Sequence, residues 1–141
     1  MRVMALDVGD KRIGVALSDP LGMLASPLTT IERRTPDIAA AIDAILALAD
    51  EHAAEEILVG IPYLMSGRIG AQTRITLDFA DELAARAKIP ITRIDERLSS
   101  VQAERMLAQA GITAADRARN RGATDAAAAA IMLQAHLDAK P

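Results

Sequence analysis

Three acidic residues stand out in this sequence because of where they fall rather than because of their type. Asp7 ends a short apolar run, Glu96 follows a second one, and Asp125 opens a final Ala-rich stretch. In α/β sheets, ligand sites form beyond the carboxyl ends of the strands. Three carboxylates gathered there would bind Mg²⁺ or Mn²⁺ through oxygen, which suits the hydrolysis of a phosphodiester. The same residues also fit ordinary turn and helix-cap positions, so spacing alone decides nothing.

The composition restricts the kinds of site that are possible. The chain has no cysteine and only two histidines, which excludes thiolate chemistry, Cys-type metal sites and a His-rich metal site. With one Tyr and one Phe, it also lacks the aromatic platform on which nucleic acid bases stack. The net charge of −3 argues against a generally basic surface but leaves room for a local basic groove.

Basic residues lie beside the first two acids. Lys11 and Arg12 fall at an expected hairpin tip near Asp7, where they would either hold a phosphate or remain solvated. Arg97 would either neutralise a phosphate, the role we favour, or pair with Asp95. We therefore include Lys11, Arg12 and Arg97 among the expected nucleic-acid-binding residues.

Two loops carry further candidates for phosphate contacts. Residues 112–123 are expected to form a loop that leads into Asp125 and carries three basic residues, Arg117, Arg119 and Arg121. Their position favours contact with a nucleic acid backbone over simple solvation. The segment Gly60-Ile61-Pro62, followed by Ser66-Gly67, would either aim N–H groups at a phosphate or form a plain strand-to-helix loop.

The hydrophobic pattern predicts the elements that position these residues. Short apolar segments at 2–7, 13–18 and 27–31 predict an antiparallel meander of three strands. The later part of the chain predicts βα units, with strands at 56–62 and 89–94 and with helices from Thr35, around 75–87, from Ser99 to Gly111, and from Asp125. The result is one α/β domain over residues 1–141, with a five-stranded mixed sheet flanked by helices.

No segment is apolar for long enough to span a bilayer. The longest uncharged apolar run near the C-terminus covers residues 126–133, far short of the ~20 residues that a spanning helix needs. Asp7 and Asp10 interrupt the apolar N-terminal segment, which argues against a signal sequence. We therefore expect a soluble cytoplasmic protein.

Four blocks of the sequence resemble the YqgF family, whose members are described as Holliday junction resolvases and as nucleases of the ribosomal RNA precursor. The blocks are residues 6–19, Val59-Gly60-Ile61-Pro62 with Ser66-Gly67, Asp95-Glu96-Arg97-Leu98-Ser99-Ser100, and Asp125-Ala126-Ala127-Ala128 with Ile131-Met132-Leu133-Gln134. The resemblance covers essentially the whole chain. It implies a ribonuclease-H-like fold, with Asp7, Glu96 and Asp125 as the catalytic metal ligands. The family commonly has lysines where this chain has Arg119 and Arg121, an exchange that preserves the charge.

This resemblance implies a Mg²⁺- or Mn²⁺-dependent endonuclease that acts on structured nucleic acid. We favour the precursor of small-subunit ribosomal RNA over a four-way DNA junction, because symmetric junction cleavage needs a dimer and the sequence indicates a monomer or weak homodimer. Two further alternatives are a non-catalytic RNA-binding module of the same fold and an ATP-using enzyme of the actin and sugar-kinase superfamily. The last of these normally needs a second similar domain.

Overall fold

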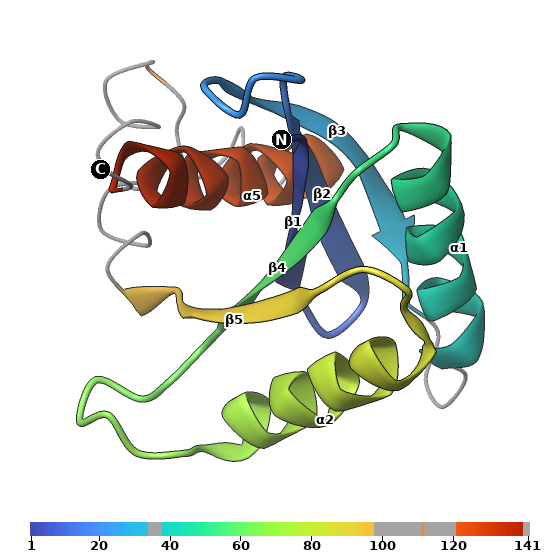
Figure 1. The fold of residues 1–141 in the computed structure, drawn as a ribbon. Coiled ribbons are helices and arrows are strands. Elements are labelled where there is room, and N and C mark those ends of the chain that lie inside the picture. Colours follow the sequence, from blue (N-terminus) through green and yellow to red (C-terminus); the bar gives the residue numbers. More distant parts are fainter. Residues whose placement is uncertain (34–37, 98–110, 112–120, 140–141) are drawn as a thin grey trace.

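The computed structural model describes residues 1–33, 38–97, 111 and 121–139 (Figure 1). Within these residues the elements follow the order β1 (Val3–Val8), β2 (Arg12–Ser18), β3 (Ala25–Glu32), α1 (Ile38–Glu51), β4 (Glu56–Ile61), α2 (Ala71–Arg86), β5 (Ile91–Asp95) and α5 (Arg121–Asp138). The helix predicted from Ser99 to Gly111 lies outside the described residues except for Gly111 itself. The predicted helix start at Thr35-Pro36-Asp37 also lies outside them.

The five strands form one mixed sheet in the order β3-β2-β1-β4-β5. Strands β1, β2 and β3 pair as an antiparallel meander, whereas β4 runs parallel to β1 and β5 runs parallel to β4. This topology confirms the predicted α/β architecture. Because β1, β4 and β5 run in the same direction, their carboxyl ends lie at one edge, and Asp7 and Glu96 are both located there.

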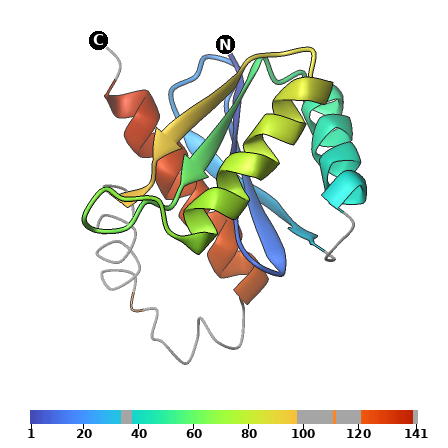
Figure 2. The same ribbon diagram turned by 90° about the horizontal axis from the view of Figure 1, so that it is seen from below.

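Alternate residues of the strands face two different helical layers. In β1, Leu6 and Val8 pack into the core under α1 and α2, whereas Val3 and Ala5 pack under α5. Figures 1 and 2 show α1 and α2 on one side of the sheet and α5 on the other. Because Asp7 continues the alternation of Val3 and Ala5, it belongs to the face that α5 covers.

Small residues form the part of the sheet on which α5 lies. Ala5 and Ala16 are buried neighbours on adjacent strands, and Gly14 follows on the same face of β2. A Cβ atom at Gly14 would overlap the backbone carbonyl of Asp125. The helix presents three buried alanines to this surface, Ala126, Ala129 and Ala130. Small residues on both sides let the α5 backbone approach the strands closely, which explains why this helix is rich in alanine.

Helix α5 begins at Arg121, about one turn earlier than the sequence predicts. The expectation that Asp125 opens the helix was therefore wrong, and Asp125 lies in the second turn. Gly122 and Thr124 lower the intrinsic helix propensity of the first turn, but packing of the following alanines on the sheet outweighs this local preference. None of the helices in the described part of the chain is long and apolar enough to cross a membrane.

Candidate active site

Asp7 lies near the end of β1, opposite Gly14 of β2, on the face covered by α5. Burial raises the pKa of Asp7 to about 6, and repulsion from the charge of Asp125 contributes to the increase. An aspartate at this position is costly to ionise, because it loses hydration and faces a second carboxylate. Asp7 and Asp125 are therefore close enough to interact although 118 positions separate them along the chain.

Glu96 follows β5 directly, and its backbone N–H donates to the carbonyl of Ile61 at the end of β4 (3.2 Å). Its side chain lies over Gly60, because a Cβ atom there would be 2.9 Å from Oε2 of Glu96. Burial raises the pKa of Glu96 to about 7, with smaller contributions from the charges of Asp7 and Asp95. Glu96 and Asp7 thus form a second repelling pair at the same sheet edge.

Asp125 completes the group from α5, where it contacts a basic residue. The Nε atom of Arg12 donates to Oδ2 of Asp125 at 3.0 Å, and the two side chains are 33% and 31% exposed. The absence of a side chain at Gly14 lets the backbone of Asp125 lie against β2. The structure therefore places Asp7, Glu96 and Asp125 in one neighbourhood, with Asp7 interacting with both of the others.

The arrangement suits a divalent cation at Asp7 and Glu96. Carboxylate oxygens are the ligands that Mg²⁺ and Mn²⁺ prefer. Burial and mutual repulsion raise both pKa values, so a cation between these two side chains would relieve an unfavourable charge distribution. As the side chains stand, no group of three His, Asp or Glu residues in the described ranges is close enough together to hold one metal ion. In this arrangement Asp125 is bound to Arg12.

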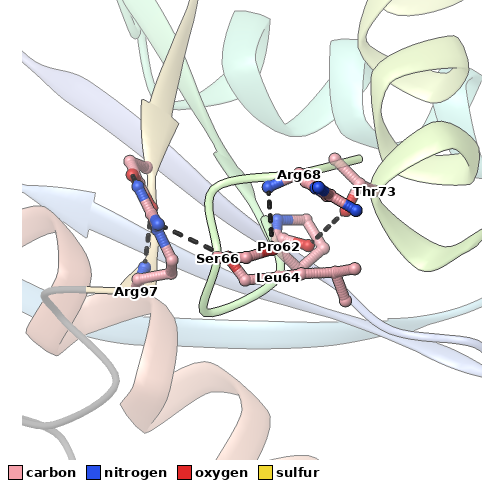
Figure 3. Close-up of polar contacts among 7 residues, drawn as sticks. Pro62, Leu64, Ser66, Arg68, Thr73 and Arg97 are labelled. Atoms are coloured by element: carbon pink, nitrogen blue, oxygen red, sulfur yellow. Dashed lines mark hydrogen bonds and ion pairs between the residues drawn. The ribbon is translucent and has the colours of Figure 1, made fainter. Parts of the chain in front are cut away.

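Polar contacts within the chain hold the loop between β4 and α2 (Figure 3). The N–H of Leu64 donates to the carbonyl of Arg68 at 3.0 Å, and the N–H of Gly67 donates to the carbonyl of Leu64 at 2.7 Å. The hydroxyl of Thr73 donates to the carbonyl of Pro62 and anchors the start of α2 to the end of β4. These bonds favour the plain strand-to-helix loop over a cradle of free N–H groups for phosphate.

Arg97 pairs with Asp95, which is one of the two roles that the sequence allows. Its Nε donates to both carboxylate oxygens of Asp95 at 3.0 Å, and a terminal nitrogen donates to the carbonyl of Leu64 at 3.4 Å (Figure 3). This pairing lowers the pKa of Asp95 and raises that of Arg97. These contacts tie the turn that carries Glu96 to the β4–α2 loop. A phosphate contact of Arg97 stays a prediction.

The other predicted phosphate-binding residues lie in different environments, and two of them fall outside the described residues. Arg12 contacts Asp125, and Lys11 is exposed in the turn between β1 and β2. Arg121 is the first residue of α5, whereas Arg117 and Arg119 lie outside the described residues. The structure thus brings one of the predicted phosphate-binding residues, Arg12, into direct contact with one of the predicted metal ligands.

Gly14 is a site residue that the sequence reasoning missed, and Gly60 is one for which it considered only a phosphate contact. Gly14 lies under Asp125, and Gly60 lies under Glu96 and Met132. Each glycine interrupts a strand pattern, and such an interruption is a recognised sign of close approach by another group. That signal was present in the sequence, but without the sheet order it does not reveal what approaches.

Gly14→Ala should destabilise the fold more than Gly60→Ala. The new Cβ at position 14 would meet the backbone of Asp125, so α5 must shift, and overpacking of this kind costs about 1–3 kcal/mol. At position 60 the nearest atoms belong to the flexible side chains of Met132 and Glu96, which can move aside. Thermal melts of the two variants measure the difference. Equal melting temperatures would show that α5 does not rest on Gly14 as described.

A family model described as "RuvX: Holliday junction resolvase" matches residues 1–139 of the chain. A relative from Roseiflexus sp. (strain RS-1) is 48% identical over 139 residues, which cover 99% of this chain and 95% of the relative. A relative from Halothermothrix orenii is 44% identical over 138 residues, which cover 98% of this chain and 95% of the relative. Both carry the name "Putative pre-16S rRNA nuclease".

Solved structures support the ribonuclease-H-like fold. RuvC of T. thermophilus, in complex with a Holliday junction substrate, matches with a TM-score of 0.58 at 17% identity, covering 97% of this chain and 96% of that chain. The fowlpox virus Holliday junction resolvase matches with a TM-score of 0.59 at 10% identity, covering 99% of this chain and all of that chain (100%). The family match and the two relatives confirm the resemblance seen in the sequence: this chain belongs to the RuvX family and is a nuclease of ribonuclease-H-like fold.

Proposed function

We propose that the chain is a Mg²⁺-dependent endonuclease that cleaves structured RNA, with a precursor of 16S ribosomal RNA as its substrate. The observation that carries the metal dependence is the interacting pair Asp7 and Glu96, whose pKa values are about 6 and about 7. Both side chains are half-buried at one edge of the sheet, and two adjacent carboxylates with raised pKa values supply the oxygen ligands that a divalent cation binds. The names of the relatives support the choice of substrate.

In this proposal Asp7, Glu96 and Asp125 would hold the metal. A bound divalent ion supplies a lowered pKa for the attacking water and stabilises negative charge on the phosphate oxygens. The contribution of the chain is to fix the position of each carboxylate. Gly14 and Gly60 leave room for Asp125 and Glu96, and the strands set the spacing.

The basic residues would bind the nucleic acid backbone. Lys11 and Arg12 lie at the β1–β2 turn, on the side of the molecule where β1 ends. Together with Arg117, Arg119 and Arg121 they would neutralise several phosphates, so binding should depend on salt more than on base sequence. The partial exposure of Arg12 and Asp125 is consistent with access for a bulky polymer.

A direct comparison of two substrates tests this proposal. We expect purified protein with Mg²⁺ or Mn²⁺ to cleave a precursor 16S ribosomal RNA fragment faster than a four-way DNA junction, and to cleave neither in EDTA. The description of the RuvX family favours the junction as the second candidate. Symmetric, paired nicks in the junction by a stable dimer, measured with light scattering, would overturn the preference for RNA.

A further inference from the structure

The contact between Arg12 and Asp125 joins the two parts of the proposed site. Arg12 is the first residue of β2, and Asp125 lies on α5, 113 positions further along the chain. The contact uses Nε, and the terminal nitrogens of Arg12 have no partner among the described residues. A guanidinium in this state can bind a phosphate through its free edge.

The backbone of Asp125 is fixed, but its carboxylate lies between opposing charges. Packing over Gly14 prevents the backbone from moving towards the sheet. The side chain is attracted by Arg12 and interacts unfavourably with Asp7. Any cation that binds at Asp7 must therefore compete with Arg12 for the Asp125 carboxylate.

We infer that Arg12 is a positioning residue that couples nucleic acid binding to metal binding, by exchanging the Asp125 carboxylate for a backbone phosphate when substrate arrives. This inference rests on the proposed function. In the free protein Arg12 pairs with the Asp125 carboxylate, and this pairing weakens the interaction of Asp125 with the metal. When a phosphate binds Arg12, Asp125 becomes available to the ion beside Asp7 and Glu96.

The exchange replaces one oxyanion partner of Arg12 with another. An ion pair about one-third exposed on each side is weak and breaks readily, so the exchange needs no large rearrangement. Because coupling of two ligands is reciprocal, the metal should strengthen nucleic acid binding by the same factor by which nucleic acid strengthens metal binding. The exchange at Arg12 would therefore favour metal binding by Asp7, Glu96 and Asp125 together when substrate is present.

Arg12→Gln should change metal binding and RNA binding in opposite directions. Titration calorimetry with Mn²⁺ alone, in the absence of nucleic acid, should give a dissociation constant about fivefold lower in the variant, because the competing cation is gone. Binding of a labelled RNA stem-loop in EDTA should weaken, and the slope of log K against log salt should fall by about one unit. Arg12→Lys keeps the charge and should lie between Arg12→Gln and the wild type in both measurements.

Lys11→Gln is the matched control, since it removes the same charge from the adjacent exposed position without touching Asp125. Its Mn²⁺ affinity should stay within about twofold of the wild type, the range of exposed charges. Equal tightening in Lys11→Gln and Arg12→Gln would overturn the inference, as would an unchanged or weaker Mn²⁺ affinity in Arg12→Gln. If the wild type itself binds no Mn²⁺, the proposed function fails and the inference fails with it.

Discussion

Asp7→Asn and Glu96→Gln should each lower the rate of Mg²⁺-dependent cleavage by about 10³-fold or more. Each change keeps the size of the side chain and removes one negative charge from the interacting pair. A catalytic divalent ion is worth several kcal/mol of transition-state stabilisation, and each 1.4 kcal/mol corresponds to a factor of ten in rate. Single-turnover rates on a precursor ribosomal RNA fragment measure the loss. The double variant should be little slower than either single one, because ligands of one ion act as a unit.

Asp10→Asn is the appropriate control for these substitutions. Asp10 is exposed in the same turn, three residues from Asp7, so its loss removes the same charge from the same hairpin. The control should cleave within about twofold of the wild-type rate, as expected of a surface substitution. If Asp7→Asn and Glu96→Gln cleave at the wild-type rate, as Asp10→Asn should, the carboxylate pair does not hold a catalytic metal. Full activity of the wild type in EDTA would lead to the same conclusion.

The order of elements could be predicted because hydrophobic period and turn residues are local signals. Isolated apolar runs rich in β-branched residues, such as Ile57 to Ile61, predict buried strands, and the structure contains them in the predicted order. The start of α5 could not be predicted, because packing of its alanines on the sheet outweighs the weak propensity of Gly122. Tertiary contact of this kind leaves no mark on the local sequence.

The site was only partly predictable for a related reason. The convergence of Asp7 and Glu96 follows from the sheet order, which short connections and parallel crossovers make accessible to sequence reasoning. The contact of Arg12 with Asp125 depends on how closely α5 approaches β2 at Gly14. That approach is a property of two surfaces far apart in the sequence, and pattern analysis does not give distances between them.

In EDTA at pH 7, Asp7→Asn should melt at a higher temperature than the wild type. The pKa of Asp7 is raised from 3.8 to about 6 by burial and by the charge of Asp125. A carboxyl with a raised folded-state pKa contributes full stability below its unfolded pKa and loses that contribution as pH rises through the folded pKa. Two pKa units correspond to about 3 kcal/mol at neutral pH, so the neutral isostere should raise the melting temperature by about 5–10 °C.

Adding Mg²⁺ or lowering the pH should each reduce the difference in melting temperature between Asp7→Asn and the wild type. Mg²⁺ at a hundred times its dissociation constant would stabilise the wild type by about 2.7 kcal/mol and the variant much less, because the variant lacks a ligand. At pH 4 the raised pKa values of Asp7 and Glu96 leave the wild type largely protonated at this site, so the metal-free gap should shrink. Melts at two pH values, with and without Mg²⁺, measure both effects.

Asp19→Asn should change stability in the opposite direction and serves as the control. The Asp19 carboxylate accepts the backbone N–H groups of Met23 and Leu24 at 2.7 and 3.1 Å, and these bonds lower its pKa. The ionised carboxylate of Asp19 therefore stabilises the folded state, so neutralising it should lower the melting temperature. Mg²⁺ should raise the melting temperature of this variant by the same amount as that of the wild type. If Asp7 were only a turn residue, Asp7→Asn would behave as Asp19→Asn does. Changes in melting temperature of opposite sign would distinguish Asp7, whose charge destabilises the metal-free fold, from Asp19, whose charge stabilises a loop.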